Sequence, residues 1–152
     1  MTEESSSLVL RRLDAADYQK GFLQLLGQLS VVGDISEELF QSRFNELSSN
    51  PDYYTVVIED KGASKIVATA SLIIERKFLR SCGKCGHIED VVVADSYRGK
   101  KLGQRVLAAL TDAAKQAGCY KIILDCSEEN APFYEKCGLS RKEIQMVKYL
   151  AS

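Results

Sequence analysis

Residues 86–103 read GHIEDVVVADSYRGKKLG and place three kinds of sequence end to end. The adjacent carboxylates Glu89 and Asp90 run into three valines, which are typical of a buried strand. A basic, glycine-containing turn follows, and apolar residues then recur at helical spacing from Leu102 to Ala114, before Gly118. A scaffold has no obvious use for this order, whereas a site that handles two different ligands does.

The rest of the chain reads as short strands and helices around this stretch. We expect strands over 8–13, 53–59, 65–75, 87–93, 120–126 and 143–150, with the DKGAS turn joining the second and third as a hairpin. Helices are expected from Asp14 to Gly33, from a cap at Asp34 or Ser36 to Pro51, from Leu102 to Gly118, and from a cap at Asn130 to Gly138. Residues 77–87 are expected to form a basic loop. The order β-α-α-β-β-β-α-β-α-β predicts an α/β (α+β) fold, with a mixed, mostly antiparallel sheet flanked by helices.

The bulk composition bounds the class of protein. The 152 residues are 45% hydrophobic and 27% charged, as in an ordinary soluble domain, with a net charge of -1 that gives no global field for nucleic acid. We expect a short disordered lead over 1–7, a single domain over 8–152 and no membrane span. The five cysteines are an odd number, and the acidic N-terminus is unlike a secretory signal, so we expect reduced thiols and a cytoplasmic location.

Cys82, Cys85 and His87 together look like half of a zinc site. A structural zinc site takes four ligands, usually from two such pairs, and the sequence has no second C-x-x-C. We therefore expect no metal cofactor, and a zinc-bound interaction module remains only a minor alternative. For His87, a structural hydrogen bond is favoured over a general-base role.

The basic turn RGKKLG can hold a phosphate or pyrophosphate. Backbone N–H groups at a helix N-terminus lack intrahelical partners and carry partial positive charge. Arg98, Lys100, Lys101 and Arg105 would add to that field. An ordinary basic helix start is the alternative, and the six residues alone do not decide between the two.

The turn also resembles the Gln/Arg-x-x-Gly-x-Gly/Ala pyrophosphate loop of the GNAT acetyltransferase superfamily, with Lys101 at the first glycine position. The blocks GHIEDVVV, GCYKIILDC and FYEKCG together resemble the glucosamine 6-phosphate N-acetyltransferase family, in its short eukaryotic, plant-like form. This resemblance runs from about Leu8 to the C-terminus. It implies a GNAT fold, acetyl-CoA as the cosubstrate and D-glucosamine 6-phosphate as the acceptor. It also implies a homodimer whose sugar site is shared between subunits.

The activity implied by the resemblance is acetyl transfer to the 2-amino group of the sugar. This reaction is a step in the synthesis of UDP-N-acetylglucosamine. Amine attack on a thioester needs a neutral amine, a polarised carbonyl and a proton for the leaving thiolate, and no covalent enzyme intermediate. The sequence has no Ser-His-Asp pattern, and this direct reaction does not need one.

The resemblance also assigns residues to the two ligands. Those implied for acetyl-CoA are Val91, Val92, Val93, Arg98, Gly99, Lys100, Lys101, Leu102, Gly103, Gln104, Asp125, Tyr134, Glu135 and Lys136. Those implied for the sugar phosphate are Ser30, Lys77, Phe78, Leu79, Arg80, Glu89, Asp90, Val91, Tyr120, Lys121 and, from the other subunit, Lys148. For each lysine, a solvated surface charge is the ordinary alternative.

Three residues are candidates for the chemistry itself. Tyr134 is expected to protonate the leaving thiolate, with Asp125 as a second candidate for proton handling, and Glu89 is expected to orient the amine. The pKa of a phenol is about 10 and that of a thiol is about 8.5, so transfer of the proton from the phenol to the thiolate is only modestly unfavourable. Neighbours on a regular strand point to opposite faces, so we expect at most one of Glu89 and Asp90 to meet a given ligand directly.

Two other classes of function stay open from the sequence. A GNAT enzyme with a peptide, lysine or polyamine acceptor would have no use for the cationic KFLR segment at 77–80. A non-catalytic acyl-CoA-binding protein could keep the RGKKLG turn but would not need Tyr134 or Asp125.

Overall fold

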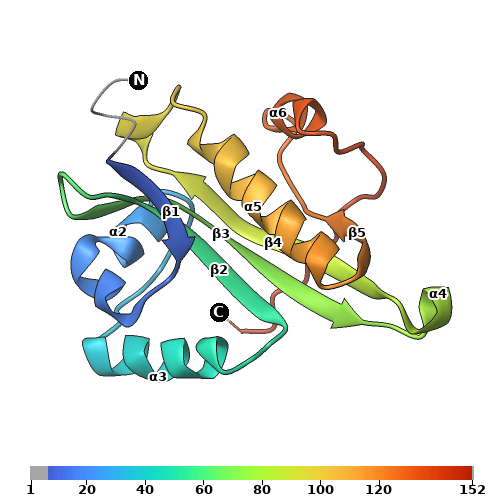
Figure 1. Cartoon of the computed structure of the whole chain (residues 1–152), viewed down its shortest axis with the longest axis horizontal. Helices are drawn as coiled ribbons and strands as arrows, with labels where there is room; N and C mark the ends of the chain where they lie inside the picture. Colours follow the sequence, from blue (N-terminus) through green and yellow to red (C-terminus); the bar gives the residue numbers. More distant parts are fainter. Residues whose placement is uncertain (1–6, 152) are drawn as a thin grey trace.

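A five-stranded sheet forms the centre of the computed structural model, which describes residues 7–151 (Figure 1). The strands are β1 (Leu8–Arg12), β2 (Tyr53–Asp60), β3 (Lys65–Arg76), β4 (Lys84–Val93) and β5 (Cys119–Ile123). They lie side by side in chain order; β4 and β5 are parallel and the other neighbours antiparallel. The helical segments are η1 (Ala15–Lys20), α2 (Phe22–Leu26), α3 (Glu37–Ser48), α4 (Leu79–Cys82), η2 (Asp95–Tyr97), α5 (Leu102–Gln116) and α6 (Ala131–Lys136). The predicted α+β class and the hairpin of β2 and β3 are confirmed.

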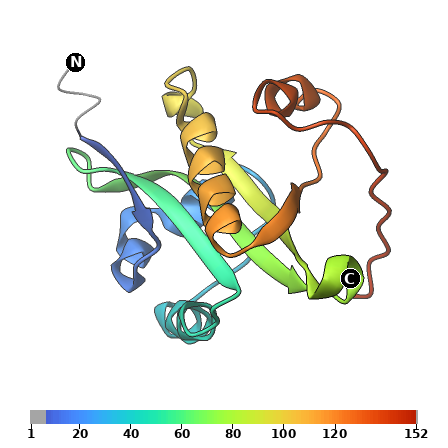
Figure 2. The same cartoon turned by 45° about the vertical axis from the view of Figure 1, so that its right-hand side comes forward.

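Two hydrophobic clusters cover the two faces of the sheet. On one face Val106, Leu110 and Ala114 of α5 pack against Val56 and Leu72. On the other face α2 and α3 bring Phe22, Leu25 and Phe40 against Val57 and Val92. Figures 1 and 2 show α5 crossing one face, with α2 and α3 behind the other. Alternate residues of β2 serve the two clusters, as the period of two along a strand requires.

A buried ion network joins β1, η1 and β2. The Arg11 guanidinium donates to Asp17 at 2.7 Å and to Glu59 at 2.9 Å, and Lys20 lies 3.1 Å from the second Glu59 oxygen. The Asp17 side chain is fully buried and Glu59 nearly so. The hydrogen bond from Arg11 is the main cause that lowers the pKa of Glu59. Glu59 is therefore held in its charged form, and both carboxylates depend on Arg11 as a hydrogen-bond partner.

We expect Arg11→Ala to destabilise the fold by about 3–5 kcal/mol, because it leaves buried carboxylates without their main partner. Urea unfolding measures this loss. Arg12→Ala is the matched control: Arg12 is exposed and lies over the Tyr54 ring at 4.4 Å, a contact that contributes about 1 kcal/mol or less. Equal losses in the two variants would contradict an essential role for the network.

Strand β4 is irregular where the adjacent carboxylates lie. Ser71 pairs with Glu89 and Thr69 with Val92, so Asp90 and Val91 both stand opposite Ala70. This is a β-bulge, and its first residue, Asp90, has a positive φ of 52°. The strict alternation of side chains is broken at this point.

β5 pairs with β4 along its whole length, but only with the first residues of β4. Their register extends from Lys84 opposite Cys119 to His87 opposite Ile123, and β4 then continues to Val93 along β3 alone. Gly86 lies at this junction; a Cβ there would approach Leu72 to 2.9 Å and Ile122 to 3.2 Å. β5 ends there and the chain turns away from β4, which leaves one edge of β4 without a strand partner among the described residues.

Some sequence predictions for the helices are wrong in detail. The first helix is not continuous to Gly33: it breaks at Gly21, which is left-handed (φ 79°), and α2 ends at Leu26. Ser36, not Asp34, caps α3, by accepting from the Leu39 N–H. Asn130 precedes α6, but its side chain makes no capping hydrogen bond. The expected loop over 77–87 contains the single turn α4, and β4 begins within it, at Lys84.

The strand predicted over 143–150 is also wrong for the single chain. Residues 139–149 have no regular secondary structure, and all of 140–151 are exposed. Alternating residues form a strand only when a neighbouring edge accepts their backbone, and the tail lies beside none here. Figure 2 shows it running apart from the sheet.

The predictions for the two termini concern residues that lie mostly outside the described range, 7–151. The lead expected over 1–7 lies outside this range except for Ser7, whose hydroxyl donates to Asp60 at 3.3 Å, and Ser152 lies outside it as well. None of the helices in the described part is long and apolar enough to cross a membrane.

Candidate active site

Three carboxylates lie within electrostatic reach of one another where β5 ends beside β4. Glu89 and Asp90 lie on β4, Asp125 follows β5, and Tyr134 lies on α6. Partial burial raises the pKa of Glu89, and the charges of Asp90 and Asp125 raise it further. The interaction with Asp125 places the end of β5 within electrostatic reach of the β4 bulge.

The bulge changes what was expected of the adjacent carboxylates. Glu89 and Asp90 are both exposed, and both raise the pKa of the half-buried Tyr53, after the larger effect of burial. The prediction that they point to opposite faces assumed a regular strand, and the regular pairing of β4 is interrupted at Asp90 and Val91. The positive φ of Asp90 had no signal in the sequence, because no glycine marks the position.

Tyr134 is held by packing. Its ring meets Phe133 edge-on, with 5.0 Å between the ring centres. A Cβ at Gly103 would lie 3.0 Å from the Phe133 ring, so this glycine lets α6 approach the first turn of α5. Burial raises the pKa of Tyr134, and the thiols of Cys126 and Cys137 add to the rise. At neutral pH the phenol therefore keeps its proton.

The predicted basic turn follows the C-terminal end of β4. Arg98 pairs with Asp95 at 2.9 Å, Gly99 has a φ of 86°, and α5 begins at Leu102. The first backbone N–H groups of α5 have no partner within the helix. The side-chain amide of Gln28 accepts from the Asp95 N–H at 2.9 Å and ties the turn to the end of α2, a contact that the sequence did not reveal.

Lys101 takes the N-cap position of α5 in the left-handed region, with φ 62° and ψ 26°. A residue with a side chain loses about 1–2 kcal/mol in this backbone conformation, which explains why the GNAT pyrophosphate-loop pattern has glycine at this position. We expect Lys101→Gly to stabilise the fold by about 0.5–1 kcal/mol. The relief of backbone strain exceeds the conformational entropy that glycine adds to the unfolded chain. Urea unfolding tests this. Lys100→Gly is the control and should bring no gain, since Lys100 has no positive φ.

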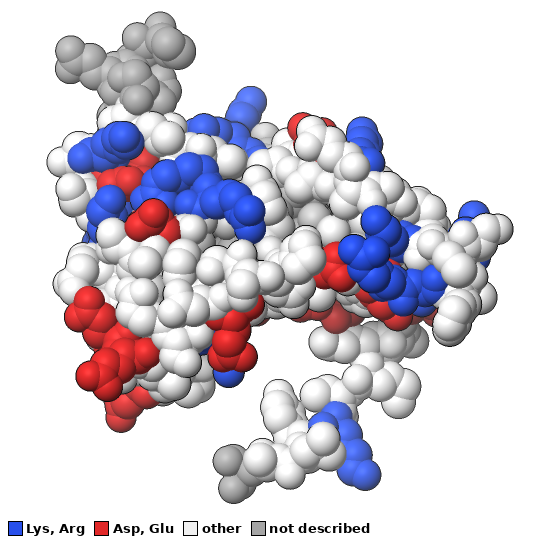
Figure 3. Space-filling view, turned by 60° about the horizontal axis from the view of Figure 1, so that its bottom comes forward, with Lys and Arg blue, Asp and Glu red and all other residues white. Residues whose placement is uncertain are grey.

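Cations and an aromatic ring gather where β4 begins. The Arg80 guanidinium lies 5.0 Å from the centre of the Tyr120 ring, and Lys121 lies 5.7 Å from it. Lys77 pairs with Glu75 at 3.3 Å. The right-hand end of Figure 3, where α4 lies in Figure 1, shows Lys and Arg beside Asp and Glu. The structure thus brings together most of the cations predicted for the sugar phosphate.

The α4 turn that carries Arg80 is unusual. Arg80, Ser81 and Cys82 all have positive φ values between 58° and 61°, and Phe78 and Leu79 before them are exposed. Three successive side chains in this region carry an appreciable backbone strain. Strain of this kind concentrates at binding sites, and it presents the apolar pair and Arg80 outward.

Two predicted sugar residues do not join this group. Ser30 follows α2, and Lys148 lies in the tail; both are exposed. The tail does reach the site through Gln145, which donates to Asp125 at 3.1 Å and which the sequence did not single out. His87 donates to or accepts from Glu75 at 2.9 Å, the structural hydrogen bond that was expected for it.

Comparison with known proteins agrees with this geometry. The acetyltransferase (GNAT) family model matches residues 16–139. A crystal structure of glucosamine-6-phosphate N-acetyltransferase from Arabidopsis thaliana is 54% identical, with a TM-score of 0.93 over 95% of this chain and 99% of that one. A Trypanosoma brucei acetyltransferase structure is 39% identical, with a TM-score of 0.88 over 94% of this chain and 99% of that one.

The partial pairing of β4 with β5, the cationic turn before α5 and the matched family model define a GNAT acetyltransferase. Among curated sequences, the Arabidopsis thaliana glucosamine 6-phosphate N-acetyltransferase is 55% identical over 92% of this chain and 95% of its own length. The Dictyostelium discoideum enzyme of the same name is 50% identical over 92% of this chain and 89% of its own. The chain belongs to the glucosamine 6-phosphate N-acetyltransferase family.

Proposed function

We propose that this chain transfers the acetyl group of acetyl-CoA to the 2-amino group of D-glucosamine 6-phosphate, which gives N-acetyl-D-glucosamine 6-phosphate and CoA. One observation carries the proposal: cations gather at both ends of β4, and carboxylates lie between them. A ten-residue strand spans about 30 Å. Two phosphate-bearing ligands can therefore meet end to end above Glu89 and Asp90.

For acetyl-CoA we propose the turn at 98–104 for the pyrophosphate. Three features support this: helix N–H groups that have no partner within the helix, the positive φ of Gly99 and the exposed side chains of Lys100 and Lys101. The free edge of β4 at 91–93 would receive the acetyl and pantetheine end, and Glu135 and Lys136 of α6 would border it.

For the sugar we propose Lys77, Arg80 and Lys121 as phosphate ligands, with Tyr120, Phe78 and Leu79 around them. Glu89 and Asp90 would hold the amino group, and Ser30 would supply a hydroxyl. This assignment rests on the charge pattern at the two ends of β4 and on the family.

The chemistry proposed is direct attack of the neutral amine on the thioester carbon. Backbone N–H groups of 91–93 would polarise the thioester carbonyl, and Tyr134 would give its proton to the leaving CoA thiolate. The support for this role is the position of Tyr134 on α6 and the family, and its phenol carries a proton at neutral pH. Asp125 is the second candidate for proton handling.

We further propose a homodimer in which the tail of one subunit completes the sugar site of the other and brings Lys148 to the phosphate. The tail exposes Ile144, Met146, Val147, Tyr149 and Leu150, each more than two thirds accessible. Figure 3 shows it projecting from the body of the molecule. Large apolar side chains left exposed together mark an interaction surface. A cytoplasmic location, with a role in UDP-N-acetylglucosamine synthesis, completes the proposal; five free cysteines suit a reducing compartment.

The test is thiol release from acetyl-CoA, compared across glucosamine 6-phosphate, glucosamine and a peptide amine. We expect glucosamine 6-phosphate to give by far the highest kcat/KM, since only it uses the cations at the start of β4. Arg80→Met should erase most of its advantage over glucosamine. Preference for the peptide amine would indicate another acceptor, and no release with any amine would indicate a protein that only binds acyl-CoA.

A further inference from the structure

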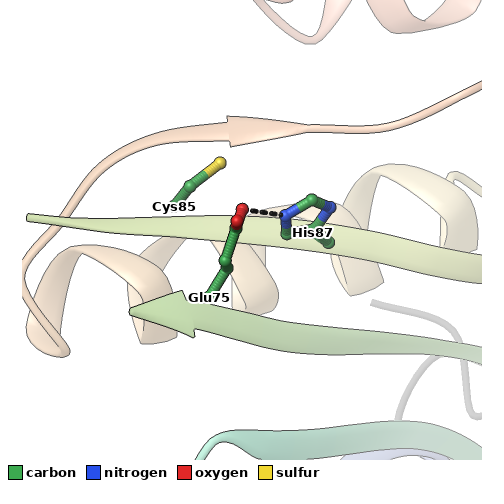
Figure 4. Close-up of side chains that lie close together, drawn as sticks. All are labelled: Glu75, Cys85 and His87. Atoms are coloured by element: carbon green, nitrogen blue, oxygen red, sulfur yellow. Dashed lines mark hydrogen bonds and ion pairs between the residues drawn. The ribbon is translucent and has the colours of Figure 1, made fainter. Parts of the chain in front are cut away.

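Three side chains with metal-binding atoms stand together where β3 ends and β4 begins. Glu75 and Cys85 are direct partners in the antiparallel register, and His87 lies two residues further along β4. A period of two puts Cys85 and His87 on one face of the strand, and partners across a register share a face. Figure 4 shows the three side chains converging, with Glu75 reaching from β3.

The donor atoms are close enough to share one ion. The Cys85 sulfur, a His87 ring nitrogen and a Glu75 oxygen all lie within 4.8 Å of one another, and His87 Nε2 is 2.9 Å from Glu75 Oε1. Bond lengths of about 2.0–2.3 Å around tetrahedral zinc place such donors roughly 3.3–3.5 Å apart. Side-chain rotations that bring the donor atoms closer by about an ångström would seat an ion.

The donor set selects the kind of metal. One sulfur, one imidazole nitrogen and one carboxylate oxygen suit Zn²⁺. They do not suit Mg²⁺ or Ca²⁺, because these hard ions prefer oxygen ligands alone. The Cys82–Cys85 pair suggested by the sequence is not the arrangement found, since Cys82 is exposed in the strained α4 turn and Cys85 is buried. Glu75 takes the place that the motif would give to Cys82.

We propose that Glu75, Cys85 and His87 form a three-ligand Zn²⁺ site, separate from the groups assigned to acetyl transfer. Water or another small ligand completes the fourth position, as in open zinc sites. Binding replaces the proton on the Cys85 sulfur by the metal, and that proton leaves to solvent. Glu75 also pairs with Lys77, so an ion in the site draws this carboxylate away from the lysine.

The test uses the full chain, reduced and stripped of metal, titrated with Zn²⁺ against a chromophoric chelator. We expect one Zn²⁺ per chain with a Kd of about 1 μM or tighter. Co²⁺ in the same site should show a thiolate-to-metal charge-transfer band. Cys85→Ser should remove the band and weaken Zn²⁺ binding by at least about tenfold, whereas His87→Gln should weaken binding and keep the band.

Cys82→Ser is the matched control, because it makes the same change three residues away at an exposed thiol. It should leave both the band and the Kd unchanged. Absence of stoichiometric Zn²⁺ binding, or a band that survives Cys85→Ser and disappears in Cys82→Ser, would overturn the proposal. If Cys85→Ser fails to fold, Glu75→Gln and His87→Gln decide, since both side chains are about a third or more exposed; an unchanged Kd in both would equally overturn it.

Discussion

Tyr134→Phe is expected to lower kcat by about 10²–10⁴, the range typical of a lost general acid, with little change in either KM. The substitution keeps the ring that packs edge-on against Phe133 and removes only the hydroxyl. The phenol carries a proton at neutral pH, so it can serve as the donor. Steady-state kinetics with both substrates varied measure the effect.

Two further measurements separate proton donation from packing. An acetyl thioester with a more acidic leaving thiol should shrink the defect of the variant, because a better leaving group needs the proton less. Tyr18→Phe is the matched control: its hydroxyl donates to the Ile35 carbonyl at 3.2 Å, near α3 and away from α6, and kcat should not change. A Tyr134→Phe protein with unchanged kcat would move the role to Asp125, to be tested by Asp125→Asn.

Deleting residues 143–152 is expected to abolish dimerisation and to lower kcat/KM for the sugar by at least about 10²-fold. The deletion removes the exposed apolar side chains proposed to pack on the partner, together with Lys148. Loss of a central cluster of interface residues costs roughly 3 kcal/mol or more, which corresponds to this factor. Sedimentation and sugar-dependent kinetics, measured on the same sample, report the two effects.

Gln145→Ala serves as the control for the deletion. It removes the hydrogen bond from the tail to Asp125 but leaves the apolar residues in place, so the variant should still dimerise. A truncated protein that is monomeric and fully active would rule out the shared site.

The sequence predicts the parts of this fold whose neighbours lie close along the chain. The spacing of Leu102, Val106 and Leu110 located α5, and the DKGAS turn located the hairpin, because helices and hairpins are specified locally. The expected strand at 143–150 failed, because alternation of side chains does not provide the edge that a strand needs.

The candidate site was predictable to the extent that its residues sit within motifs. The cationic turn directly precedes α5 and the KFLR segment lies between β3 and β4 in the structure, since each is a continuous stretch of the chain. The bulge at Asp90, the partnership of Glu75 with Cys85 and the contacts of Gln28 and Gln145 depend on register and on long-range packing. No spacing in a single sequence encodes these contacts.

The short junction between β4 and β5 gives the molecule two regions of unequal stability. β2 and β3 pair along most of their length in the middle of the sheet, whereas β5 is joined through the few positions from Lys84 to His87. α6 has six residues, too few to be stable as an isolated helix. Amide hydrogens of β5 and α6 should therefore exchange with deuterium through partial openings, well before those of β2 and β3.

Asp125 follows β5 and Tyr134 lies on α6, in this more easily opened region, whereas Glu89 and Asp90 lie on β4, which pairs with β3. A ligand that bridges β4 and the end of β5 would join the two regions, and it should slow deuterium uptake in β5 and α6 far more than in β2 and β3. Formation of the complete site would then coincide with the docking of β5 and α6 onto the rest of the fold.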